Sequence, residues 1–216
     1  MWLKTGEMIF FVLMFVLSAG AVPNGNKLTA SDSTEFAREK FKRAASPDGK
    51  AAILLRQAVN EDVDPTMEAQ AGKRKIALGD LRRSARVFWR PDSRVAILWD
   101  TAYSNHDFVR LIRVKPTLAE IPQFDELIKK KVRKAFRAMQ SGEIFHYWPH
   151  VMGWTEDKQL LVVVDADATA SKNPLETRVV GLCHGYVIDT DRVAIRSQLN
   201  EAEVVKAIGS APNPCE

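Results

Sequence analysis

Three residues with metal-ligating side chains stand in one short segment, Glu143, His146 and His150. Histidines four residues apart share one face of an α-helix, which is a common spacing in zinc sites. Pro149 argues against a helix here, because proline lacks an N–H donor and restricts Trp148 to extended backbone. In a strand the two imidazoles would stand about 13 Å apart, too far for one ion. We therefore expect no metal and no cofactor.

Pairs of alternate carboxylates follow two apolar runs, Asp165 with Asp167 and Asp189 with Asp191. Calcium would need a third oxygen source, and no 12-residue calcium loop follows either pair. Turn and strand-end chemistry explains the pairs better. No glycine-rich phosphate loop and no G-x-S-x-G motif occurs. No catalytic motif is found, and a secreted hydrolase with Asp165, Asp167 and Asp189 as acid–base residues is the alternative function.

The N-terminus has the organisation of a secretory signal peptide. Lys4 precedes an apolar run from Met8 to Leu17, and Ala19-Gly20-Ala21 supplies small residues for cleavage. An uncleaved membrane anchor is the alternative, but the run is shorter than the roughly 20 residues that span a bilayer. We expect residues 1–21 to be removed, which leaves 22–216 as one exported domain, periplasmic or extracellular, without a transmembrane span.

Both cysteines, Cys183 and Cys215, lie in the expected mature chain. An exported protein meets an oxidising compartment, in which an even number of cysteines persists as disulfides. The sequence therefore favours a Cys183–Cys215 bridge that ties the C-terminal tail to the body. Two free thiols are the alternative, and an activated thiolate at Cys183 beside His184 is less favoured.

An amphipathic helix is expected from Phe124 to Gln140. Pro122 precedes it, and Asp125 and Glu126 place negative charge at its N-terminus, where the helix dipole favours it. Its apolar residues recur on one face at about 100° per residue. They are Phe124, Ile128, Val132, Ala135, Phe136 and Met139.

The basic residues of this helix form the one informative charge feature. The 216-residue chain has a net charge of +4 and 46% hydrophobic residues, as expected of a globular protein. The helix alone accounts for that excess. Export makes nucleic acid a poor partner, so we expect an acidic protein or an anionic surface, with a merely solvated face as the alternative. The candidate partner-binding residues are Lys129, Lys130, Arg133, Lys134 and Arg137.

One turn pattern recurs three times before an apolar strand, around Asp48, Asp92 and Asp157. Proline precedes the aspartate in the first two copies and presets φ at the second turn position, while aspartate suits the third. Glu156 replaces proline in the third copy, so that turn is less constrained. We predict that the three aspartates are structural. The strands that follow are continuously apolar, which is typical of strands covered on both faces.

The turn resembles the W-S-P-D-G/S-K/R blade turn of TolB-type and related WD-like β-propellers. The resemblance covers residues 40–115 and 145–198, and the segments Lys75–Leu81 and Gly185–Thr190 are similar to the next strand of such blades. It implies a mainly β fold, but three repeats are fewer than the 4–8 blades of a closed propeller. An incomplete set of antiparallel blades, a bent sheet or a sandwich is therefore expected. The motif implies no activity, because propellers host many.

The remaining segments complete a single propeller-like domain. The interval between Asp92 and Asp157 is longer than that between the first two turns, which indicates a helical insertion over 117–142. Asn200 and Glu203 have the spacing of a capping box and predict a short C-terminal helix. Residues 60–73 are expected to form an acidic loop. Together these features indicate an exported binding module with no catalytic motif, whose ligand and oligomeric state stay open.

Overall fold

The structure is a computed structural model that describes residues 28–29, 33–37, 42–57, 63–101, 103–170 and 179–215. The expected signal peptide, residues 1–21, lies outside the described residues. Within them, no helix is long and apolar enough to cross a membrane.

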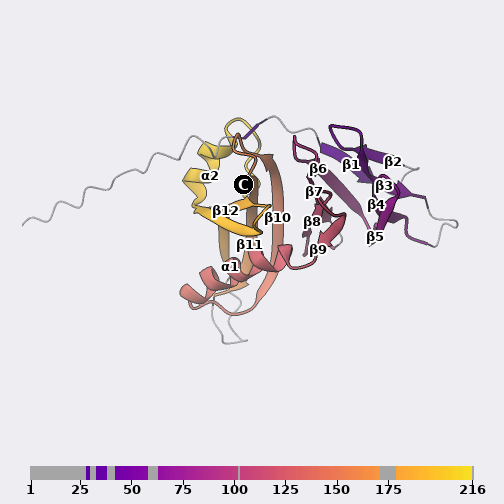
Figure 1. Cartoon of the computed structure of the whole chain (residues 1–216). Helices are drawn as coiled ribbons and strands as arrows, with labels where there is room; N and C mark the ends of the chain where they lie inside the picture. Colours follow the sequence, from indigo (N-terminus) through magenta and orange to yellow (C-terminus); the bar gives the residue numbers. More distant parts are fainter. Residues whose placement is uncertain are drawn as a thin grey trace, which may run out of the picture.

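Three antiparallel sheets and two helices make up the fold, so the expectation of a mainly β protein is confirmed (Figure 1). In each sheet, four strands that follow one another in the sequence pair with their neighbours. The first sheet contains β2 (Lys42–Ala45), β3 (Ala51–Arg56), β4 (Thr66–Ala71) and β5 (Arg74–Asp80). The second contains β6 (Ser84–Trp89), β7 (Val95–Thr101), β8 (Phe108–Arg113) and β9 (Ala119–Ile121), with β1 (Ser33–Ala37) added beside β6. The third contains β10 (Ile144–Trp154), β11 (Leu160–Thr169), β12 (Val179–Asp189) and β13 (Ala194–Leu199).

The second sheet lies between the other two and buries side chains on both faces (Figure 1). On β7, Leu98 belongs to the apolar cluster shared with the first sheet, whereas Ile97 belongs to the cluster shared with α1 and the third sheet. Both side chains are fully buried. This two-sided burial explains why the strand is a continuous apolar run rather than an alternating one.

The three repeated turns connect β2 to β3, β6 to β7 and β10 to β11. Gly49, Ser93 and Lys158 occupy equivalent positions with φ of 68°, 58° and 59°. Asp48 accepts a hydrogen bond from the Lys50 N–H, and Asp92 accepts one from the Arg94 N–H. Both hydrogen bonds close the turn in which the aspartate lies.

The third turn is built differently. Its Gln159 N–H donates to the Thr155 hydroxyl, and Asp157 makes no hydrogen bond among the described residues. Asp157 is exposed. In the first two turns, the aspartate carboxylate accepts a backbone hydrogen bond, which fits the structural role predicted for it. In the third turn, the threonine hydroxyl accepts the equivalent bond instead.

Two of the turns also join neighbouring sheets. Arg90 is 2% exposed, and its guanidinium bonds Asp92 at 2.8 Å, Asp191 at 3.0 Å and Thr190 at 3.1 Å. Thr190 and Asp191 belong to the β12–β13 turn of the third sheet. Lys115, beyond β8, forms a 2.9 Å ion pair with Asp48 of the first sheet. The turn aspartates thus hold the sheets together as well as shaping the turns.

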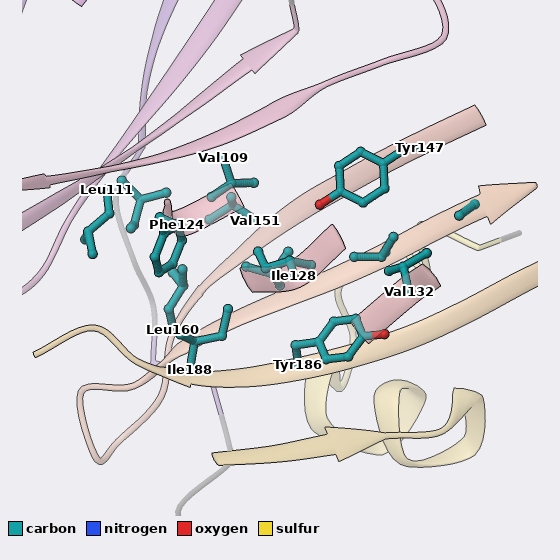
Figure 2. Close-up of a cluster of buried hydrophobic side chains, with 14 of the residues drawn as sticks. Val109, Leu111, Phe124, Ile128, Val132, Tyr147, Val151, Leu160, Tyr186 and Ile188 are labelled. Carbon is teal, nitrogen blue, oxygen red and sulfur yellow. The ribbon is translucent and has the colours of Figure 1, made fainter. Parts of the chain in front are cut away.

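Helix α1 (Phe124–Ala138) fills the space between the second and third sheets. Its stripe of Phe124, Ile128, Val132 and Phe136 is buried, with at most 2% exposure (Figure 2). The stripe contacts the side chains of β8, β10, β11 and β12 that Figure 2 labels. The helix begins at the predicted residue and ends two residues earlier than expected, because Gln140 takes a positive φ of 57°.

Helix α2 (Glu201–Ile208) covers the outer face of the third sheet (Figure 1). Asn200 and Glu203 form the predicted capping box. Gly185 allows the close approach of the helix, since a Cβ there would stand 2.8 Å from a Val204 methyl carbon. The structure joins Cys183 to Cys215 as a disulfide, which anchors the C-terminal tail to β12.

The two outer faces of this stack differ. On the first sheet, Glu68 pairs with Arg56 and Lys75 across neighbouring strands, so that face is polar. On the third sheet, α2 and the tail cover the apolar residues. Each sheet is open within the described part of the chain.

Two expectations for the first sheet were wrong. The segment 60–73 was expected to be an acidic loop, but Thr66–Ala71 forms β4. Lys75–Leu81 was expected to be the strand after β3, yet it largely forms β5, because β4 pairs with β3 first. Met67 and Ala69 alternate with polar residues and point into the core, which is the pattern of a half-buried strand.

Candidate functional site

The outer face of α1 presents four cations to solvent, Lys130, Arg133, Lys134 and Arg137. Because the apolar stripe is buried, these side chains lie on the opposite side of the helix. Arg133 forms a 3.1 Å pair with the exposed carboxylate of Glu126. The other three cations have no ion-pair partner among the described residues. The structure thus places four of the five predicted partner-binding residues on one accessible surface.

Lys129 does not belong to that surface, which corrects the sequence-based assignment. Its side chain is 14% exposed and its Nζ lies 2.8 Å from Asp125 Oδ2. The same Nζ stands 4.7 Å from the ring centre of Phe108 and 5.2 Å from that of Tyr147. The spacing of Asp125 and Lys129 would have suggested the ion pair, but only the tertiary fold brings the two rings to it.

A cleft of about 400 Å³ lies where β8, β9 and the first turns of α1 meet. Strand β9 is short, so it leaves the Val109 N–H without a strand partner, and Asp125 Oδ1 accepts from this N–H at 3.3 Å. Charged residues dominate the walls. They are Asp100, Arg110, Glu120, Asp125, Glu126 and Lys129.

Two buried aspartates stand near the end of β7. Asp100 is 8% exposed and lines the cleft, and burial raises the pKa of its carboxyl group. Asp107 is 7% exposed and accepts a 3.1 Å hydrogen bond from the Trp99 indole. Burial, reinforced by the negative charge of Asp100, raises the pKa of Asp107 to about 6. Sequence reasoning missed both residues, which flank the loop between β7 and β8.

His106 and Tyr147 form the neighbouring wall toward the third sheet. Their ring centres are 5.3 Å apart, and both line a smaller cavity of about 100 Å³ beside Lys129. Burial, followed by the charge of Lys129, lowers the pKa of His106. Burial and the nearby Asp125 raise the pKa of Tyr147 well above its ordinary value. The imidazole and the phenol are therefore both neutral near pH 7.

The histidines considered for zinc lie on strand β10, not on a helix. His146 bonds Asp167 through Nδ1 at 3.1 Å, and its ring stacks on Trp148 with centres 4.4 Å apart. His150 instead contacts the Trp99 ring at 5.5 Å. Among the described residues, no group of three or more histidine, cysteine, aspartate or glutamate side chains is arranged to hold a metal ion.

The carboxylates of the hydrolase alternative do not converge. Asp165 lies inside β11 rather than at its end, and it is paired with Cys183. Asp189 is at the other end of the sheet, where it accepts hydrogen bonds from backbone N–H groups and from Arg196. Asp167 pairs with Gly181, eight residues from Asp189, which is about 27 Å along a strand. These three residues therefore do not form one active site.

The comparisons with known proteins add no family. No protein-family model, curated protein or solved structure matches this chain at a significant level.

Proposed function

We propose that the protein is an exported binding module in which propeller-like sheets present helix α1 to an acidic protein partner. The burial of the α1 apolar stripe carries this proposal. A helix that docks by its apolar face would leave that face uncovered, whereas here it is part of the core. The accessible surface that remains is the cationic face of Lys130, Arg133, Lys134 and Arg137.

The same observation favours an acidic protein over a lipid surface. Amphipathic helices bind membranes by burying an apolar face in the headgroup region, with cations adding electrostatic attraction. The apolar face of α1 packs against β8 and the third sheet and is not available for insertion. Charge attraction alone then has to supply the affinity, which suits a flexible or exposed acidic segment.

The propeller-like description and the export are parts of this proposal. Three consecutive four-stranded meanders, each with the same turn after its first strand, support a relation to propeller blades. The α2 cap and the polar outer face of the first sheet favour an open stack of three blades over a closed ring. The disulfide fits an oxidising compartment, and sequencing the N-terminus of the secreted protein should find residue 22 first.

The direct test compares two quadruple variants of equal charge change. One replaces Lys130, Arg133, Lys134 and Arg137 by glutamine. The control replaces exposed residues of the first sheet, namely Lys42, Arg43, Lys73 and Arg74, by glutamine. Binding of fluorescent poly-glutamate is then measured by anisotropy across a salt series.

The α1 variant should bind about tenfold more weakly at low salt, and the wild-type affinity should fall steeply as salt rises. The first-sheet variant should lose much less of its affinity for poly-glutamate. Equal losses for the two variants would mean that net charge, not the α1 face, governs binding. Binding of the wild type to anionic phosphatidylglycerol vesicles but not to poly-glutamate would replace the acidic protein with a lipid surface.

A further inference from the structure

The cleft beside α1 contains one carboxylate that the protein pairs only at long distance. Arg110 bonds Glu120 through two nitrogens, at 2.8 and 2.9 Å. Lys129 pairs with Asp125 at 2.8 Å. Arg110 and Lys129, the two cations of the cleft wall, thus form their short ion pairs with Glu120 and Asp125. Glu126 pairs with Arg133 outside the cleft, which leaves Asp100 as the acidic wall residue without a close ion pair.

The contacts of Asp100 are weak for a buried carboxyl group. Its Oδ2 lies 3.9 Å from Arg110 Nη1, beyond hydrogen-bond distance. Its Oδ1 is buried and has no hydrogen-bond partner among the described residues. The positive charges of Arg110 and Arg82 oppose the effect of burial on the pKa of this carboxyl group. A buried carboxyl group with so few donors is unfavourable, so a donor that reaches this carboxylate from the cleft would be favoured.

The cleft also offers an aromatic surface suited to a cation. Phe108 lines it, and the ring already stands 4.7 Å from the ammonium of Lys129. A volume of about 400 Å³ is in the range of small-ligand sites. A carboxylate beside an aromatic ring suits an organic cation, whose N–H groups bond the carboxylate while its charge lies near the ring.

We propose that the cleft formed by β8, β9 and α1 binds a small organic cation, an ammonium or guanidinium group, through the Asp100 carboxylate. The N–H donors of the ligand bond the cleft-lining carboxylate of Asp100, and its charge balances the acidic wall. The alkyl part packs against Phe108 and Ile121. This site is separate from the outer face of α1, and it does not depend on an acidic protein partner.

The experiment uses butylguanidinium as the probe and butylurea as its neutral isostere. Titration calorimetry at pH 7.5 should show binding of butylguanidinium to the full-length protein and at least tenfold weaker binding of butylurea. Butylamine in a parallel titration distinguishes an ammonium from a guanidinium preference. Absence of butylguanidinium and butylamine binding at millimolar concentration would overturn the proposal, and so would equal binding of the neutral isostere.

Two variants identify the anchor. Asp100→Asn keeps the shape of the side chain and should weaken butylguanidinium binding at least tenfold, whereas Asp157→Asn, in the exposed turn of the third sheet, should leave it unchanged. Glu120→Gln releases Arg110, which can then neutralise Asp100, and it should also weaken binding. Neither prediction requires a loss of fold, which circular dichroism checks. Wild-type affinity in a folded Asp100→Asn or Glu120→Gln protein would show that Asp100 is not the anchor.

Discussion

The second sheet makes two interfaces, and they differ in whether their buried polar groups have hydrogen-bond partners. At the first interface, with the first sheet, the core is apolar and the one indole at its edge is satisfied, since Trp89 Nε1 donates to the Ala44 carbonyl at 3.1 Å. At the second interface, with α1 and the third sheet, Trp154 Nε1 and Tyr186 Oη are buried and have no hydrogen-bond partner among the described residues. The remaining described groups of this kind, on Asp100 and Ser141, adjoin the cleft and the end of α1.

This difference indicates a division of roles. Two sheets that pack directly on each other can match their side chains closely, and an apolar interface stabilises the fold. At the second interface the loop before β8 bonds the Tyr147 backbone of β10, α1 fills the rest, and some polar groups of the described residues are left without partners. Unsatisfied buried polar groups lower stability and often mark a functional region. The cleft, the raised pKa values of Asp100 and Asp107 and the cationic face of α1 all occur on this side.

The largest expected effect comes from the ionic cluster at the rim of the second interface. Asp92→Ala removes one of two carboxylates that hold the buried Arg90 and should lower the free energy of unfolding by about 3 kcal/mol. Asp157→Ala changes the equivalent position of the exposed third turn and should cost less than about 0.5 kcal/mol. Urea denaturation of both variants measures the two changes. Similar losses would indicate that the turn itself, and not the bond to Arg90, explains the role of Asp92.

At the first interface we expect a loss of stability when a polar bond is removed. Trp89→Phe deletes the donor to the Ala44 carbonyl and part of a buried ring, which should lower the free energy of unfolding by about 2 kcal/mol. Chemical denaturation monitored by circular dichroism provides the value. An unchanged midpoint would contradict the view that this interface depends on satisfied polar contacts.

At the second interface the corresponding change should have the opposite sign. Tyr186→Phe removes a buried hydroxyl that has no partner in the described structure and should raise the free energy of unfolding by about 1 kcal/mol. Burial also raises the pKa of this phenol to about 12, which agrees with an apolar surrounding. A destabilised Tyr186→Phe protein would mean that the hydroxyl is satisfied in solution, and the contrast between the interfaces would then weaken.

An effect as small as that of Tyr186→Phe, and present only at higher pH, is expected at Asp107. The pKa of Asp107 is raised to about 6, so its contribution to stability is full below its ordinary value of 3.8 and is lost as pH rises through 6. Asp107→Asn keeps an acceptor for Trp99 and should be more stable than the wild type at pH 7.5, but not at pH 4. After allowance for solvent screening the difference should be about 1 kcal/mol, or 2–4 °C in Tm.

The control for this measurement is the shape of the whole pH profile. Burial raises the pKa of the Asp100 carboxyl group, as it does for Asp107. Burial lowers the pKa of His106 and His150. Because these two imidazoles resist protonation in the folded state, they reduce its stability at acid pH. The variant and the wild type share these groups, so the difference between their Tm values reports Asp107 together with its coupling to the charge of Asp100. A difference that stays constant from pH 4 to 7.5 would exclude a raised pKa for this carboxyl group.

Local patterns in the sequence determined much of the fold. The apolar stripe of α1, the Asn200 capping box and the positions of the three turns follow from spacing within a few residues. The cysteine pair followed from its number and from the expected compartment. Such features are predictable because each depends on backbone geometry and side chains that are close in the sequence.

The tertiary structure alone decided the sites. Lys129 was grouped with the cations of the binding face, but its position at the margin of the stripe turns it toward Phe108 and Tyr147. Asp100 and Asp107 lie at the ends of one loop and give no motif, and their chemistry arises from burial against α1 and the third sheet. Burial and cross-strand neighbours depend on register and on how sheets pack. Residues distant in the sequence determine both burial and cross-strand neighbours, so the spacing of residues along the chain does not predict them.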